Sequence, residues 1–179
     1  MIMGEFGIRV RDRDLWRQAA AWAGAAVGYG GAQALSAWLA RRAQVSGTRP
    51  QYEQLARPAF APPGIVFPVV WSALNLTTAT SAWLVWRSGE RGREVPSRRP
   101  ALVCWALAVV VRSGYVPLAF GGRRLWAATA DSALLCAVMA RYALLARRTG
   151  RPAAALAVPE IAWTAFATVL SAAVASKNN

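Results

Sequence analysis

The chain has 179 residues, of which 56% are hydrophobic and only 16% carry a charge. Soluble domains carry about 25% charged residues, so this composition and the mean hydropathy of +0.28 argue against a soluble protein. The formal charge of +13 comes almost entirely from arginines outside the apolar runs, a pattern that favours headgroup anchors over nucleic-acid binding. Histidine is absent, which removes the commonest metal and haem-iron ligand, and we expect no metal site.

Long apolar runs dominate the chain. A helix that crosses a membrane needs about 20 mostly apolar residues, because each residue rises about 1.5 Å through a core about 30 Å thick. Runs of this length occupy residues 15–39, 65–86, 101–120, 125–146 and 153–175. We therefore predict an all-α membrane protein, a bundle of five transmembrane helices. It would form a single domain over residues 15–175, with a charged tail at 1–14 and a short tail at 176–179.

The first run raises the question of a signal peptide, because arginines precede it and small residues end it. It is longer than a typical signal-peptide core, and tryptophan and tyrosine interrupt it. We expect it to be kept as the first span.

The connection over residues 41–64 has a distinct composition. Tyr52, Leu55 and Phe60 predict that it packs on an apolar surface. Its prolines prevent one continuous helix: Pro50, Pro58, Pro62 and Pro63. Long loops of this kind commonly cover a site, so we predict a lid-like loop between helices 1 and 2. A plain linker is the alternative.

The remaining connections and the cysteines support further predictions. The turns at 121–124 and 147–152 are short, so the helices that they join should be antiparallel neighbours. Cys104 and Cys136 lie in separate runs at different depths, which predicts free, buried thiols. Arginine is more frequent on the side of the N-terminal tail, which favours a cytoplasmic N-terminus. The alanine- and arginine-rich composition favours a bacterial plasma membrane.

Four motifs follow one another from residue 52 to residue 171. Residues 52–75 (YEQLARPAFAPPGIVFPVVWSALN) lead through a Pro-x-x-Trp into the second span, and residues 115–122 (YVPLAFGG) close the third. Asp131 follows in the fourth span, and residues 159–163 (PEIAW) lie in the fifth. In order and spacing these motifs resemble the TspO/MBR family of tryptophan-rich sensory proteins and translocator proteins (the peripheral benzodiazepine receptor family). The chain looks like a divergent member.

The resemblance implies that the protein folds as a five-helix bundle, often as a homodimer. The first loop would cover a pocket for tetrapyrroles, such as protoporphyrin or haem, or for other flat hydrophobic ligands. We accordingly predict an integral membrane receptor or sensor with no covalently bound cofactor, whose partners are the lipid bilayer and a hydrophobic small molecule. The resemblance also leaves open light-dependent porphyrin breakdown, for which the family's two tryptophans correspond to Trp71 and Trp163. A transporter of small amphipathic solutes is a third possibility.

Helical spacing predicts that the family positions converge. Five of them lie about 9–15 Å below the first-loop side, when each residue counts as about 1.5 Å: Trp71, Asn75, Arg112, Asp131 and Trp163. An aromatic-lined cup at that depth suits a flat apolar ligand. The alternative, an interfacial belt, fits tryptophans at the ends of runs: Trp16, Trp38, Trp86 and Trp126. The predicted ligand-binding residues are Phe60, Pro68, Trp71, Asn75, Arg112, Tyr115, Asp131, Glu160, Trp163 and Ala167.

Arg112 is the unusual residue of the third span. A charge at mid-membrane costs about 2.5–3.5 kcal/mol on insertion scales, so it needs a partner inside the bundle. Asp131 is nearest in depth and is favoured, and Glu160, about 8 Å deeper by the same count, is the alternative within reach of a long side chain. A second hypothesis is that Arg112 also receives an anionic group of the ligand, such as a propionate. An Arg112→Ala variant that binds anionic and neutral analogues unchanged would contradict it.

Several positions depart from the family pattern. The family usually has asparagine at Arg112, tryptophan at Tyr115 and tyrosine at both Asn75 and Glu160, while asparagine stands at Ser171 and tryptophan at Phe60. The predicted pocket is therefore more charged and less aromatic than is usual in the family, which leaves the identity of the ligand open.

Overall fold

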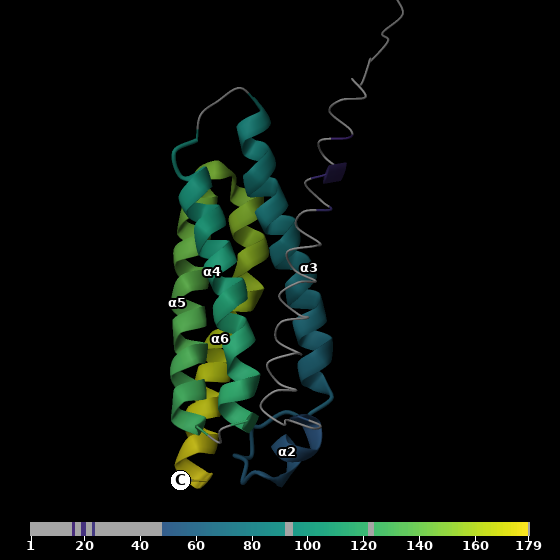
Figure 1. The fold of residues 1–179 in the computed structure, drawn as a ribbon, viewed down its shortest axis with the longest axis vertical. Helices are drawn as coiled ribbons and strands as arrows, with labels where there is room; N and C mark the ends of the chain where they lie inside the picture. Colours follow the sequence, from purple (N-terminus) through teal and green to yellow (C-terminus); the bar gives the residue numbers. More distant parts are fainter. Residues whose placement is uncertain are drawn as a thin grey trace, which may run out of the picture.

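The computed structural model describes residues 48–91, 95–121 and 124–178, together with four helical residues near the start of the chain, Trp16, Ala19, Ala20 and Ala23. The predicted tail at 1–14 lies outside the described residues, and so does the predicted first span at 15–39 apart from those four. The described part of the chain consists of helices and their connections (Figure 1).

The described elements follow one another in this order: α2 (Thr48–Gln54), α3 (Val66–Arg87), a 3₁₀ turn at Ser88–Arg91, α4 (Arg98–Val116), a π-helical turn at Pro117–Gly121, α5 (Leu125–Thr149) and α6 (Arg151–Asn178). Helices α4, α5 and α6 each extend beyond the apolar run by two to three residues at one end or both. Arginine is a good helix former, so the charges at these ends mark the limit of the apolar run and not the limit of the helix.

Three of the described helices are long and apolar enough to cross a membrane: Arg98–Gly121, Leu125–Thr149 and Arg151–Asn178. Helix α3 has 22 residues and is not among these three; it carries several hydroxyl side chains. Most of its hydroxyl groups bond within the helix: Ser72, for example, donates to the Pro68 carbonyl at 2.7 Å, and Thr80 donates to that of Leu76 at 2.8 Å. Hydroxyls satisfied in this way are compatible with an apolar surrounding.

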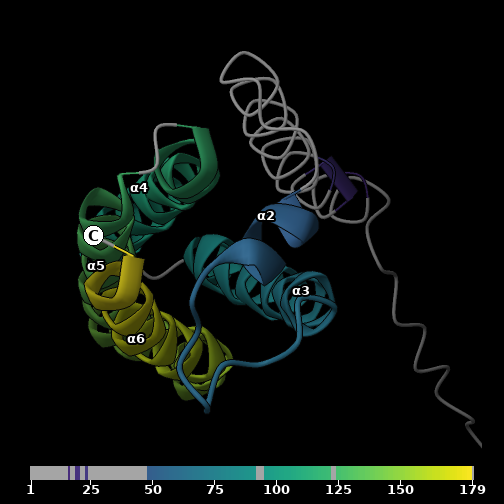
Figure 2. The same cartoon turned by 90° about the horizontal axis from the view of Figure 1, so that it is seen from below.

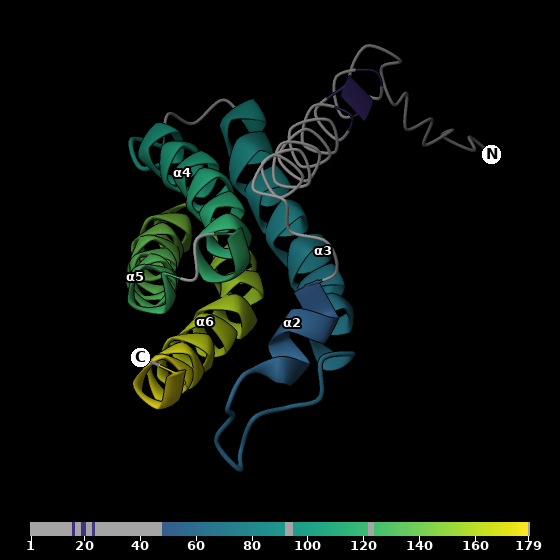
Figure 3. The same ribbon diagram turned by 60° about the horizontal axis from the view of Figure 1, so that its bottom comes forward.

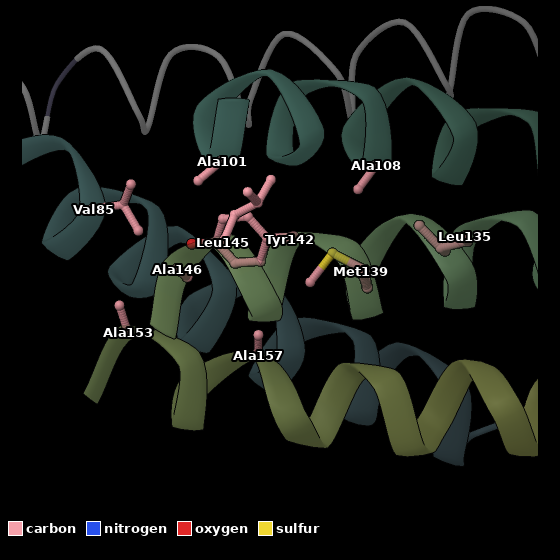
Figure 4. Packing of buried hydrophobic residues seen from close by; sticks show 10 residues of the cluster. All are labelled: Val85, Ala101, Ala108, Leu135, Met139, Tyr142, Leu145, Ala146, Ala153 and Ala157. Atoms are coloured by element: carbon pink, nitrogen blue, oxygen red, sulfur yellow. The ribbon is translucent and has the colours of Figure 1, made fainter. Parts of the chain in front are cut away.

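Helix α5 lies between α4 and α6 and packs against both (Figures 1 and 2). The chain direction reverses at each short connection, so the predicted antiparallel neighbours are confirmed. Small residues make the contact close, and the core cluster between these helices includes five alanines that are at most 2% exposed: Ala101, Ala108, Ala146, Ala153 and Ala157. Figure 4 shows these alanines around Tyr142 and Met139 of α5. Packing of small residues is a main source of helix association in lipid.

The two cysteines are free thiols, as predicted, and both are half-buried rather than fully buried. The sulfur of Cys136 lies 3.7 Å from the Ile161 carbonyl of α6. This weak contact adds to the packing of α5 against α6.

A buried polar cluster joins three helices at the end of the bundle away from α2. Ser81 of α3 donates to the Ala153 carbonyl of α6 at 2.6 Å, and the Tyr142 hydroxyl of α5 lies 2.6 Å from the same serine oxygen. The serine has one proton, which it gives to the carbonyl, so Tyr142 is the donor to Ser81. Both side chains are fully buried.

Replacing Tyr142 by phenylalanine is therefore expected to lower the free energy of unfolding by about 1 kcal/mol, because one buried hydrogen bond is lost without a change in packing. Unfolding of the detergent-solubilised protein by a graded addition of SDS measures this difference. Ser176→Ala, which removes an exposed hydroxyl from α6, is the control. Equal stability of Tyr142→Phe and the wild type would show that the cluster contributes nothing.

Candidate functional site

A cavity of about 560 Å³ lies between α3, α4, α5 and α6 at the end of the bundle that carries α2. Sites for small molecules commonly measure about 300–1,000 Å³, so the space suits a ligand of that kind. The C-terminal end of α6 lies at the same end of the bundle (Figure 3). Most of the wall is apolar, and its aromatic side chains are Tyr52, Phe67, Trp71, Tyr115, Phe120 and Trp163.

Most of the residues predicted from the sequence surround this cavity. Those that line it are Pro68, Trp71, Asn75, Arg112, Tyr115, Asp131, Trp163 and Ala167. Phe60 does not line it: its side chain is 53% exposed and packs against Phe166 of α6, with ring centroids 6.4 Å apart. Glu160 does not line it either, because it is fully buried beside Arg112. That any of these residues binds a ligand stays a prediction.

Arg112 has three neighbours inside the bundle. Its Nη2 atom forms an ion pair with Glu160 of α6, and its Nη1 atom donates to the side-chain oxygen of Asn75 of α3 at 2.6 Å. The guanidinium group also lies over the ring of Trp71, 5.4 Å from the centroid. The prediction that Asp131 is the partner of Arg112 is therefore wrong. The partner is Glu160, and the pair links α4 to α6.

Two physical reasons explain this difference. A methyl group added to Gly114 would lie 2.9 Å from the Asp131 carboxylate, so the Gly114 side of α4 faces Asp131. Arg112 is two residues away, and residues at that spacing point to opposite sides of a helix. Depths estimated from residue number are comparable only if all helices end in one plane, whereas α6 continues to Asn178 and projects beyond α5 (Figure 1). Glu160 is therefore nearer to Arg112 than the count indicated.

A chain of aromatic rings attaches the segment 48–64, which contains α2, to the bundle. Tyr52 packs edge-on against Phe67 of α3 with centroids 5.0 Å apart, and Phe67 contacts Trp163 of α6 at 5.9 Å. Trp163 contacts Phe166 at 5.4 Å, and Phe166 contacts Phe60. The segment thus contributes both ends of the chain of rings. The predicted apolar packing of Tyr52 and Phe60 is confirmed.

Polar contacts hold the same segment at the end of α6. The side chain of Asn178 accepts a hydrogen bond from the Ala56 amide at 3.0 Å and donates to the Ala56 carbonyl at 2.9 Å. The Tyr52 hydroxyl donates to the Pro62 carbonyl at 3.2 Å. Burial raises the pKa of the Tyr52 phenol, and the neighbouring Arg57 opposes that shift, so Tyr52 remains a donor at neutral pH. These contacts hold the segment against the bundle, and three of its residues line the cavity: Tyr52, Leu55 and Gly64.

Comparison with known sequences places the chain in a family. A sequence model of the TspO/MBR family matches residues 24–176. The chain belongs to the TspO/MBR family. It is 28% identical over 127 residues to the tryptophan-rich protein TspO of Chlorobaculum tepidum, a match that covers 71% of this chain and 78% of that protein. It is 29% identical over 120 residues to the translocator protein of Ovis aries (67% of this chain, 70% of that protein) and 26% identical over 130 residues to the uncharacterized membrane protein YtaB of Bacillus subtilis (71% and 79%).

In this TspO/MBR protein the cavity holds buried polar atoms that have no hydrogen-bond partner among the described residues. They belong to side chains that line the cavity: Nε of Arg112, Oδ2 of Asp131 and Nε1 of Trp163. A buried polar atom without a partner costs about 1–3 kcal/mol. A group that reached one of these atoms with matching hydrogen-bond geometry would recover part of that cost.

Some lining residues of this TspO/MBR protein were not predicted. Phe67 lies four residues before Trp71, so the helical spacing that selected Trp71 and Asn75 was sufficient to find it. Tyr52 lies in α2, within the connection that precedes α3, and only its apolar packing was predicted. Gly114, which does not itself line the cavity, gives no sequence signal, although a Cβ there would lie 2.9 Å from the carboxylate of Asp131.

Proposed function

We propose that this TspO/MBR protein is a membrane receptor or sensor that binds a flat hydrophobic ligand of the tetrapyrrole class inside its bundle. The observation that supports this most strongly is the cavity of about 560 Å³ with six aromatic side chains in its wall. Aromatic walls suit a flat π-system, because stacked and edge-on ring contacts each contribute about 0.5–1.5 kcal/mol beyond the buried area. The covering segment 48–64 supports the proposal, because it limits access of water to such a ligand.

The proposal does not include a contact between Arg112 and a propionate of the ligand. Both of its terminal nitrogens already have partners, Glu160 and Asn75. The proposal therefore rests on the aromatic lining and does not require a propionate at Arg112.

A titration with protoporphyrin tests the proposal. We expect saturable binding in the micromolar range to the detergent-purified protein, followed by the shift of the porphyrin absorption band and by quenching of tryptophan fluorescence. The variant Trp71→Phe/Trp163→Phe should bind at least about tenfold more weakly, because two rings of the wall become smaller. The absorbance readout matters here, because it does not depend on the tryptophans that are removed.

Trp126→Phe is the matched control for this titration. Trp126 is 55% exposed on α5 and lies outside the cavity, so this variant should bind like the wild type. An absence of saturable binding to the wild type would refute the tetrapyrrole assignment. Equal weakening by Trp126→Phe would show that the cavity is not the site.

A second candidate function is light-dependent breakdown of a bound porphyrin, with dioxygen as the oxidant. The observation that favours it is that Trp71 and Trp163 line the same cavity. Under illumination in air, the wild type should then bleach the porphyrin faster than Trp71→Phe/Trp163→Phe at equal occupancy. Equal rates would exclude a role for these two residues.

We also propose that residues 15–39 form a further membrane span, the first in chain order. The N-terminus would be cytoplasmic, and the protein would lie in a bacterial plasma membrane. The arginine distribution supports this orientation. Cysteine labelling in intact cells tests the orientation. Single cysteines are placed at residues 5 and 93 of a variant in which serine replaces Cys104 and Cys136. Both positions should be protected from a membrane-impermeant reagent.

A further inference from the structure

We infer that the cavity selects a flat hydrophobic ligand with a cationic or N–H-donating group, which Asp131 accepts, over a ligand whose polar edge is a carboxylate. This inference rests on the proposed function, because it specifies the charge of the ligand that the same cavity binds.

Of the two charged side chains that line the cavity, one has a countercharge nearby and the other does not among the described residues. Among the described residues, Arg112 and Asp131 are the two charged side chains that line it. Glu160 lies directly behind Arg112, fully buried, and neutralises it. The positive charge is therefore compensated within the protein, while the negative charge of Asp131 has no countercharge among the described residues.

Asp131 lines the cavity and has no polar partner in the part of the chain that the structure describes. It forms no ion pair with a described residue, and its Oδ2 atom is buried and has no hydrogen-bond donor among them. The other side of the carboxylate rests against Gly114, where a methyl group would come within 2.9 Å of Oδ1. The missing side chain at Gly114 thus leaves the space that the carboxylate occupies.

The charge of Asp131 favours a ligand that carries a cation or a hydrogen-bond donor. A carboxylate in an apolar, water-poor cavity attracts a cation strongly, and charge-assisted hydrogen bonds are about twice as strong as neutral ones. A ligand carboxylate would be repelled by Asp131. At Arg112 it would meet a charge that Glu160 already neutralises, with Nε as the nitrogen that has no partner among the described residues. A tetrapyrrole meets the requirement through a ring N–H or a cationic side group, and not through its propionates.

Three probes with the same ring separate these cases. They are mesoporphyrin IX as the free diacid, its neutral dimethyl ester, and its bis(dimethylaminopropyl) amide, which is cationic at pH 7. Binding is measured by absorbance titration of the full-length protein in a non-ionic detergent at pH 7. We expect the cationic amide to bind about tenfold more tightly than the diacid, with the ester between them.

Three variants assign the preference to individual charges. Asp131→Asn should remove the advantage of the cationic amide. Glu160→Gln should leave Arg112 uncompensated and improve binding of the diacid relative to the amide. Glu53→Gln removes a carboxylate from the exposed side of α2, outside the cavity, and should keep the wild-type order. Unchanged binding of the neutral ester shows that each variant is folded.

The outcomes separate this inference from the proposed function. Saturable binding in which the wild type takes the diacid as tightly as the amide would overturn the inference and leave the proposed function standing. A preference for the amide that survives Asp131→Asn would also overturn it. If none of the three probes binds saturably to the wild type, the proposed function fails, and the inference fails with it.

Discussion

Replacing Glu160 by leucine is expected to lower the free energy of unfolding by about 3–5 kcal/mol, because the guanidinium group of Arg112 would remain inside the bundle without a countercharge. Glu160 is fully buried, and the side chain of Arg112 is 11% exposed, so water offers little compensation. The hydrogen bond from Arg112 to Asn75 remains, but a neutral amide cannot replace a carboxylate. SDS titration of the detergent-solubilised protein measures the loss.

A double-mutant cycle separates the ion pair from simple loss of packing. Arg112→Leu/Glu160→Leu should be considerably more stable than either single variant, because a buried ion pair replaced by two apolar side chains often costs nothing. Val158→Leu is the control on the same helix, since Val158 is 56% exposed and its replacement should change the stability by less than about 0.5 kcal/mol. If Glu160→Leu is as stable as this control, the ion pair does not hold α4 and α6 together.

The positions of the helices could be predicted from the sequence because their cause is local. An apolar run of about 20 residues crosses a membrane as a helix whatever surrounds it, since backbone groups in lipid must bond within the segment. Helical spacing also selected side chains that share one face: Trp71 and Asn75 on α3, and Trp163 and Ala167 on α6. All four line the same cavity.

The partner of Arg112 could not be predicted because it depends on how the helices are rotated and shifted against one another. Depth along a helix is set by residue number, but facing direction is not, and the close approach of Asp131 to Gly114 has no signal in the sequence. The contact partner of Phe60 also could not be predicted from the sequence. Its apolar character predicted packing, yet only the tertiary structure shows that it contacts Phe166 on the outside of the cavity.

The sequence also did not reveal how the segment 48–64 is attached. Its prolines predicted an irregular chain, and the structure shows α2 followed by turns. The attachment comes from residues far apart in sequence, such as the contact between Asn178 and Ala56. Phe67 has a central place in it, because it lies between Tyr52 of the segment and Trp163 of α6.

Replacing Phe67 by alanine is therefore expected to release the segment 48–64 while the bundle stays folded. Two ring contacts are lost, each of about 0.5–1.5 kcal/mol, so the segment should open about tenfold to a hundredfold more often. Hydrogen exchange of amides in residues 50–64 measures the opening, and α5 should exchange as in the wild type. A bound porphyrin should also dissociate faster by a similar factor, if the segment controls its exit.

The control for this variant is Val69→Ala, two residues away on the same helix. Val69 is 65% exposed and lies outside the cavity, so its truncation should leave both the exchange of residues 50–64 and the porphyrin off-rate unchanged. Faster exchange in Phe67→Ala without faster porphyrin release would show that the segment is attached as described but is not the exit. Unchanged exchange would mean that Asn178 and the remaining rings hold the segment without Phe67.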